Sequence, residues 1–419
     1  MRRLRHTIVF LLAFTAVCQG RGKVTEETVA AAPDACILTE RAHLRFPGSA
    51  DSYGLFIAKL DSLLRGEKDE VRIWHLGASH VQGGTFSNTV RENFASMAAG
   101  MRGNRGFLFP MRLAGTNQEK GYFISTEGKW KSELMTKSSD RSGTRYGVTG
   151  FAATTSDPGA KVFLDLGING KGLWSFNKLR ILGYSSGEGT AAPSVRCGQT
   201  SVEFVREEDT ASFLFSLPED TDTLSIGFDI PENQSFTLTG IQPLSSRTGV
   251  SYYSSGVNGS TSAQWAARAV DLERDLALIR PDLCIIGLGI NDSAGSSGRF
   301  NAEAFKGNIR SLIAKVRHSS PGCAFVFITT NDCYYFVSRR RMAYNSNAPL
   351  ERKAIYELAQ EYDGAVWDLY DLMGGAKSVN GWKAAGLMSR DRLHFSPEGY
   401  RLLGNALFNA LIEGTDDLD

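Results

Sequence analysis

The sequence predicts an α/β protein: a three-layer α/β/α sandwich with a parallel sheet, interrupted by an inserted, jelly-roll-like β-sandwich. Two observations carry this prediction. Continuous apolar segments alternate with amphipathic helical patterns on both sides of the insertion, which is typical of a parallel sheet covered by helices on both faces. From about residue 103 to 245, short alternating runs are separated by Gly, Ser, Asp and Pro, and this favours antiparallel strands.

Length and charge limit the classes of protein that fit. The chain has 419 residues, 42% hydrophobic and 22% charged, which is enough for a sizeable core and favours two folded domains. Its 46 Lys and Arg nearly balance 45 Asp and Glu, for a formal charge of +1. No overall field therefore favours a polyanion, and no nucleic-acid partner is expected.

The N-terminus is typical of an export signal. Three arginines precede the apolar run 7–17, which is too short to span a bilayer. We therefore expect a signal peptide over residues 1–20 and an exported protein, either periplasmic or lipid-anchored at the cell envelope. Cys18 stands where a bacterial lipoprotein would be acylated, but the preceding Val17 is larger than is usual there. Lipid attachment at Cys18 and cleavage after Gly20 remain open alternatives.

The elements of the α/β domain can be placed along the chain. Strands are expected at 71–76, 283–288, 324–329 and 365–368, and helices at 85–97, 262–279, 302–318 and 349–362. The insertion carries alternating runs at 161–166, 178–184 and 223–228. The predicted domains are an α/β domain in two parts, residues 34–105 and 247–419, with the β-sandwich at 106–246.

Polar residues follow the predicted strands where the carboxyl ends of parallel strands converge. Ser79 comes just after the first strand and Asn291 just after the second, while Asp391 and His394 precede the final helix. Acyl transfer needs a hydroxyl, a base within reach and a group that orients the base. The sequence therefore predicts Ser79 as nucleophile, His394 as general base and Asp391 as the carboxylate that orients it.

The developing oxyanion would need hydrogen-bond donors. The candidates are the backbone N–H groups of Ser79 and Gly259 and the side-chain amide of Asn291. Each residue also has a plainer interpretation: Ser79 as a turn residue, Asn291 as the end of a strand, Gly259 as a positive-φ position and His394 as a cap of the last helix. The combination, and not any single residue, favours the active-site interpretation.

These blocks resemble the SGNH (GDSL-type) hydrolases. Gly77-Ala-Ser79, Gly259, Gly289-Ile-Asn291 and Asp391-Arg-Leu-His394 occur in the order of that family's conserved blocks, over about 250 residues outside the insertion. The resemblance implies a flavodoxin-like sheet and a serine esterase that uses neither metal nor cofactor. One departure is Ala78, because the family's first block normally reads Gly-Asp-Ser.

His80 and the inserted β-rich module resemble the branch that contains peptidoglycan O-acetylesterases. This implies removal of O-acetyl or other small acyl groups from peptidoglycan or another acylated polysaccharide, with the insertion similar to a carbohydrate-binding module. Two alternatives stay open. A glycan O-acyltransferase would use the same triad, and a non-catalytic glycan-binding protein would use the same scaffold without turnover.

Overall fold

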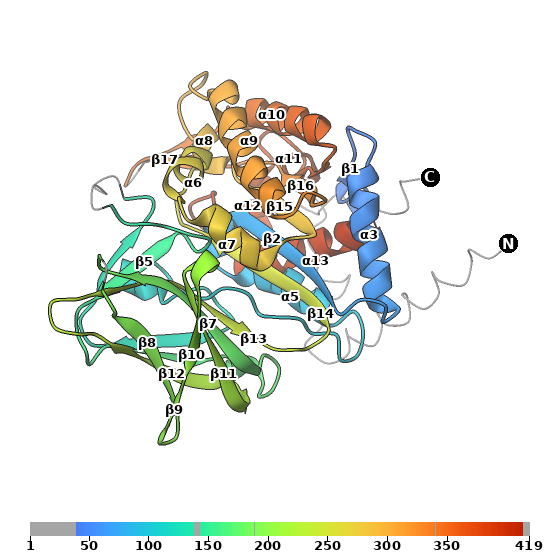
Figure 1. Cartoon of the computed structure of the whole chain (residues 1–419). Coiled ribbons are helices and arrows are strands. Elements are labelled where there is room, and N and C mark those ends of the chain that lie inside the picture. The colour runs from blue at the N-terminus through green and yellow to red at the C-terminus, as the bar shows by residue number, and fades with distance from the viewer. Residues whose placement is uncertain (1–38, 138–142, 188, 340, 414–419) are drawn as a thin grey trace.

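The computed structural model describes residues 39–137, 143–187, 189–339 and 341–413 and has two parts packed against each other (Figure 1). The predicted signal peptide, with Cys18, lies outside the described residues. One part is a parallel sheet with helices on both faces, and the other consists of two antiparallel sheets. The predicted fold class is confirmed.

The sheet of the α/β part has six strands. They are β1 (Leu44–Arg45), β2 (Glu70–Gly77), β14 (Gly249–Gly256), β15 (Leu283–Gly287), β16 (Ala324–Ile328) and β19 (Ala365–Trp367). Their order is β1-β19-β16-β15-β2-β14, and every neighbouring pair except β1–β19 is parallel. The chain order reverses direction at β2, so the loops after β2, β14 and β15 meet at one edge of the sheet, where α/β proteins bind ligands.

Helices cover both faces of this sheet (Figure 1). One face carries α3 (Asp51–Leu64), α5 (Thr85–Ala95) and α13 (Pro397–Glu413), and the other carries α6 (Ser262–Arg268), α7 (Leu272–Ile279), α9 (Ala302–Ser319) and α10 (Ala348–Tyr362). Shorter helices are α4 (Ser79–Gln82), α8 (Ile290–Ser293), α11 (Leu369–Leu372), α12 (Val379–Ala384), η1 (Thr39–Arg41), η2 (Met111–Ala114), η3 (Gly167–Asn169) and η4 (Glu208–Thr210). Successive strand residues pack into separate cores on the two faces of the sheet; Ile285 lies in one core and Ile286 in the other.

The inserted part is a β-sandwich. Its strands are β3 (Phe123–Glu127), β4 (Lys131–Leu134), β5 (Phe151–Thr155), β6 (Lys161–Asp165), β7 (Phe176–Ser185), β8 (Ala192–Cys197), β9 (Thr200–Val202), β10 (Phe204–Glu207), β11 (Ser212–Thr221), β12 (Thr223–Asp229) and β13 (Phe236–Leu244). They form sheets of order β10-β11-β7-β13-β5-β4 and β3-β6-β12-β8-β9. One buried apolar cluster includes Phe151 and Ile241 of this module together with Leu276 of α7 and Ile309 of α9. The module therefore shares a hydrophobic core with one face of the α/β part.

The single helix expected at 262–279 is wrong, because the chain forms α6 and α7 there. Ala269 leaves the helical region with ψ 67°. The buried carboxylate of Asp271, which precedes α7, accepts a hydrogen bond of 3.0 Å from Nε of Arg145 in the inserted segment. This long-range ion pair fixes the start of α7 and interrupts the helical pattern.

Several further elements were not expected from the sequence, among them α3 and β1. Another is β14, which pairs in parallel with β2 along its whole length. A further one is the antiparallel hairpin of β17 (Tyr334–Ser338) and β18 (Arg341–Tyr344) after β16. In the described part of the chain, no helix has the length and apolar character needed to cross a membrane.

Candidate active site

Ser79 lies at the start of α4, immediately after β2. The turn is tight: a Cβ atom at Gly77 would lie 2.4 Å from Cγ2 of Val81. Ala78 has φ −116° and ψ −131°, outside both the helical and the extended regions. This strand-to-helix turn holds the Ser79 hydroxyl at the carboxyl edge of the sheet.

The structure brings Ser79, His394 and Asp391 together. Nε2 of His394 lies 2.9 Å from Oγ of Ser79, and Nδ1 of His394 lies 2.7 Å from Oδ2 of Asp391. Because an ionised carboxylate only accepts hydrogen bonds, Nδ1 carries the proton and Nε2 is left as the acceptor for the Ser79 hydroxyl. Such an arrangement can activate a serine hydroxyl at neutral pH.

Asp391 is held in its ionised form by the loop that carries it, residues 389–394, called the histidine loop below. Its Oδ1 accepts hydrogen bonds of 3.0 Å from the backbone N–H groups of Leu393 and His394, and a further one from the Ser389 hydroxyl. Burial works against ionisation, but the hydrogen bonds from His394, Ser389 and the two amides outweigh it and hold the pKa of Asp391 well below its ordinary value. The carboxylate thus stays charged beside the imidazole.

The three predicted oxyanion donors face the same edge of the sheet. Gly259 follows β14 with φ +75°, and no atom lies within 4 Å of the position a Cβ would take, so the space beside it is open. Among the described residues, no acceptor is recorded for the backbone N–H of Ser79 or of Gly259. Nδ2 of Asn291 donates one hydrogen bond, of 3.0 Å, to the carbonyl of Ser260, and its second N–H remains available.

Gln82 connects these parts and was not found from the sequence. Its side chain is 1% exposed, and its Oε1 accepts a 2.6 Å hydrogen bond from the backbone N–H of Asn258. Its Nε2 donates to Oγ1 of Thr116 at 3.0 Å and to the carbonyl of Asn117 at 2.9 Å. Gln82 therefore fixes the loop carrying Gly259 relative to the helix that carries Ser79.

The surroundings of position 78 suit alanine and not the aspartate that is usual in the SGNH blocks. The Ala78 side chain is 2% exposed and belongs to a buried apolar cluster, where a carboxylate would be poorly solvated. The loop after β14 is held instead by Gln82, and Nδ2 of Asn258 adds a 2.6 Å hydrogen bond to Oδ1 of Asn117. A neutral amide network thus supports the loop after β14.

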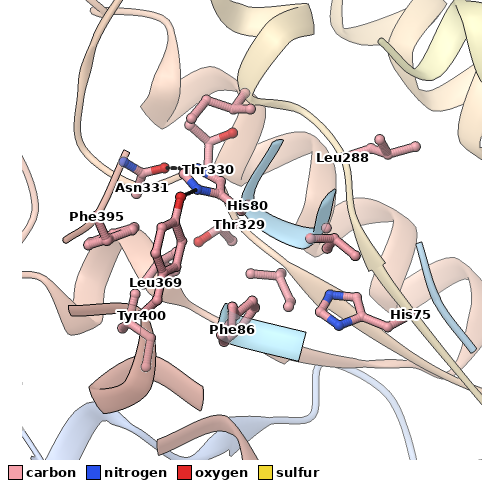
Figure 2. Close-up of a pocket in the computed structure, with 15 residues that line it drawn as sticks. His75, His80, Phe86, Leu288, Thr329, Thr330, Asn331, Leu369, Phe395 and Tyr400 are labelled. Carbon is pink, nitrogen blue, oxygen red and sulfur yellow. Dashed lines mark hydrogen bonds between the residues drawn. The ribbon is translucent and has the colours of Figure 1, made fainter. Parts of the chain in front are cut away.

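His80 takes part in a second hydrogen-bond network, with Tyr400 and Asn331 (Figure 2). Nδ1 of His80 lies 2.7 Å from the Tyr400 hydroxyl, and Nε2 lies 3.1 Å from Oδ1 of Asn331, whose Nδ2 donates to the Leu393 carbonyl at 3.3 Å. Burial, assisted by the nearby His394, lowers the pKa of His80 to about 3. The neutral ring therefore links the nucleophile turn to the histidine loop.

The apolar pocket beneath His80 is a separate feature from the reactive edge. Its lining includes His75, Phe86, Leu369 and Tyr400, but neither Ser79 nor His394 (Figure 2). Here His75 is fully buried within β2 and bonds to the Tyr252 hydroxyl at 2.6 Å. It is a core histidine, as its position within the strand suggests.

Asp292 serves a structural hydrogen-bond network. Its carboxylate accepts from the backbone N–H of Ser262 at 3.0 Å and from its hydroxyl at 2.6 Å, at the start of α6. Burial raises the pKa of Asp292. Within the described ranges, no group of three or more His, Cys, Asp or Glu side chains is arranged to hold a metal ion.

Comparisons with known proteins agree with this architecture. The model of the GDSL-like lipase/acylhydrolase family matches residues 232–402. A solved structure described as a peptidoglycan O-acetylesterase in action aligns with a TM-score of 0.68 at 20% identity, covering 88% of this chain and 98% of that one. No curated protein sequence matches.

Two other solved structures align over a smaller share of this chain. An acetyl xylan esterase aligns with a TM-score of 0.31 at 17% identity over 38% of this chain and 81% of its own. A GDSL-like lipase from Bacteroides thetaiotaomicron aligns with a TM-score of 0.30 at 20% identity over 38% and 75%. Residues 232–402 therefore match the GDSL-like lipase/acylhydrolase family, and the whole chain shares its fold with the peptidoglycan O-acetylesterase.

Proposed function

We propose that the protein is an exported serine esterase that removes O-acetyl or other small acyl groups from peptidoglycan or another acylated polysaccharide. The observation that carries the proposal is the continuous hydrogen-bond chain from Asp391 through His394 to Ser79. It ends beside open backbone N–H groups. A binding protein without turnover would have no need of this alignment, so the geometry favours an enzyme.

In the first step, the Ser79 oxygen attacks the ester carbonyl while His394 takes the hydroxyl proton at Nε2. The negative charge that develops on the carbonyl oxygen is stabilised by the N–H groups of Ser79 and Gly259 and by the free amide hydrogen of Asn291. Asp391 stabilises the imidazolium that forms. His394 then gives the proton to the departing sugar hydroxyl, and an acyl-serine remains.

In the second step, water attacks the acyl-serine. His394 accepts a proton from this water, and the tetrahedral intermediate forms in the same set of donors. When it collapses, His394 returns the proton to Oγ of Ser79 and the carboxylic acid leaves. Every bond broken and formed is accounted for by these side chains and water.

The substrate class is supported by two observations. The solved structure that aligns over 88% of this chain and 98% of its own length is described as a peptidoglycan O-acetylesterase. The N-terminal sequence is typical of an exported protein, which would meet an envelope polymer and not a cytosolic metabolite.

The test is acetate release from p-nitrophenyl acetate, O-acetylated peptidoglycan and acetylated xylan by the wild-type protein and by Ser79→Ala. We expect hydrolysis that falls by roughly a thousandfold or more in the variant, because the nucleophile is lost. A wild-type protein that releases no acetate from any of the three would contradict the proposal. Product that appears only with an added sugar acceptor would show an acyltransferase instead.

A further inference from the structure

The hairpin β17–β18 projects from the active-site edge of the molecule. It follows β16 at the edge where Ser79 lies and pairs with no other strand among the described residues. Figure 1 shows β17 extending outward beside α8, and Nδ2 of Asn345, just after β18, donates to Oγ of Ser293 in α8 at 3.0 Å. An isolated two-stranded ribbon is only marginally stable, so the contacts that hold this hairpin in place show which part of the protein positions it.

The base of the hairpin is attached to the histidine loop. The backbone N–H of Tyr334 donates to the Arg392 carbonyl at 2.9 Å, and the Arg392 guanidinium lies 3.7 Å from the centre of the Tyr334 ring. Tyr344, on the paired strand β18, also contacts a cation: the Lys377 ammonium lies 3.3 Å from the centre of its ring. The two tyrosines face each other across the ribbon at 5.6 Å. Two cations thus sit on an aromatic pair next to the catalytic base.

Both cations occupy strained backbone positions. Arg392 has φ +54° and Lys377 has φ +69°, a region that glycine adopts without the steric cost that a side chain brings. The cost is on the order of 1 kcal/mol or more at each position. Both positions carry a long charged side chain despite this cost.

The outer half of the hairpin adds exposed charge and apolar surface. Phe336 is 52% exposed and Val337 40% exposed, and the side chains of Arg339 and Arg341 are exposed at the tip. Within the described residues, no carboxylate forms an ion pair with Arg339, Arg341 or Arg392, whereas Lys377 interacts with the Asp332 carboxylate. The arginines therefore present positive charge that no carboxylate of the described residues pairs with.

We propose that the hairpin β17–β18 is a binding arm for an acidic glycan, so that the substrate of the proposed esterase is a polymer whose sugars carry carboxylates near the acylated hydroxyl. The cations would pair with the carboxylates, and the exposed ring of Phe336 offers an apolar face to a sugar ring. The inference rests on the proposed function, because the arm can hold a substrate for hydrolysis only if the triad beside it is active.

The arrangement favours a glycan over an anionic membrane. The register of the ribbon shifts between Phe336 and Ser338, so Val337 lies at a bulge. Phe336 and Val337 are followed by the exposed Arg339 and Arg341, and two apolar side chains alone make a small surface for entry into a bilayer. A strand of sugars can run along one face of the ribbon from the arginines at the tip to Arg392 beside the triad.

The test compares acetylated pectin, whose galacturonate units are acidic, with acetylated glucomannan, which is neutral. In Arg339→Gln/Arg341→Gln, we expect the ratio of kcat/KM on pectin to kcat/KM on glucomannan to fall about fivefold, mainly through KM on pectin, since each exposed ion pair is worth little. Added salt should abolish the difference between variant and wild type. The matched control is Lys68→Gln/Arg280→Gln, which removes two cations before β2 and β15, at the opposite edge of the sheet.

An unchanged ratio, or an equal fall in the control, would overturn the proposal. So would binding of the Ser79→Ala protein to vesicles of anionic lipid but not to polygalacturonate. If the wild-type protein hydrolyses no ester, the proposed function fails. Binding of Ser79→Ala to polygalacturonate then still tests the arm separately: binding that the double variant loses supports it, and binding that the double variant keeps contradicts it.

Discussion

Replacing Gln82 by alanine tests whether the loop that carries Gly259 is held in place from the nucleophile helix. The change removes the acceptor of the Asn258 N–H, at 2.6 Å, and the donor to the Asn117 carbonyl, at 2.9 Å. Both bonds belong to a side chain that is 1% exposed, so water does not replace them freely. A buried amide left without a partner costs about 1–3 kcal/mol, and we expect a loss of about 2–4 kcal/mol in the free energy of unfolding.

The effect on catalysis should be separable from this loss of stability. Loss of one oxyanion donor lowers kcat by roughly 10²–10³-fold, and a Gly259 loop that is displaced but not absent should cost on the order of tenfold to a hundredfold. KM for p-nitrophenyl acetate should change little, because the donors act mainly in the transition state. Gln82→Glu keeps the acceptor for Asn258 but loses the donors, and should fall between the wild type and Gln82→Ala.

The measurement is steady-state hydrolysis of p-nitrophenyl acetate at a temperature where thermal unfolding shows every variant to be folded. Gln242→Ala is the matched control. Gln242 is also 1% exposed and accepts a 2.7 Å hydrogen bond from Arg180, but it lies in β13 of the inserted module. It should lose stability without losing kcat. A folded Gln82→Ala protein whose kcat stays within about twofold of the wild type would refute the reasoning, since that is far below the effect of a lost donor.

Three other predictions follow from the site. Asn291→Ala should lower kcat on p-nitrophenyl acetate by roughly 10²–10³-fold with little change in KM, and an unchanged kcat would exclude Asn291 as an oxyanion donor. Ala78→Asp should lower the thermal midpoint without raising kcat, because it puts a carboxylate into an apolar cluster; higher activity would show that the usual aspartate is missed. Burial lowers the pKa of His75 from 6.5 to about 3, so the unfolded chain takes up a proton below pH 6.5 while the native one does not. The stabilisation that neutral His75 provides is complete above pH 6.5 and is lost as the pH falls toward 3. The difference in free energy of unfolding between the wild type and His75→Gln should therefore shift by about 2 kcal/mol between pH 7.5 and pH 5. A difference that stays constant over this range would contradict the prediction.

The sequence predicted the parts of the fold that local pattern determines. The apolar strands at β2, β15 and β16 and the helices α9 and α10 have strong periodicity, and the structure has them within one or two residues of the predicted ends. Strand β14 was missed because it is rich in serine. Two of those serines are hydrogen-bond partners of distant side chains: Oγ of Ser255 accepts from Nε1 of Trp74 at 2.8 Å, and Oγ of Ser254 accepts from Arg91 at 2.7 Å. Local composition does not reveal that such partners exist.

Some residues of the site could be predicted from local sequence and others could not. Ser79, Asp391 and His394 were predicted because their chemistry and their positions after strands and before a helix are visible in the chain. Gln82 was not, because its partners lie 34 to 176 residues away and meet it only after folding. The break between α6 and α7 has a similar origin, since Arg145 in the insertion pairs with Asp271.

Covalent trapping of the acyl-enzyme tests the central claim most directly. The wild-type protein would be mixed with p-nitrophenyl acetate, quenched in acid within the first turnover, digested and analysed by mass spectrometry, beside Ser79→Ala and His394→Ala. We predict one acetyl group on the peptide that contains Ser79, in the wild-type protein alone. Acetyl transfer to another residue at the same rate in all three proteins, or steady hydrolysis by Ser79→Ala at the wild-type rate, would contradict the assignment of Ser79 as the nucleophile.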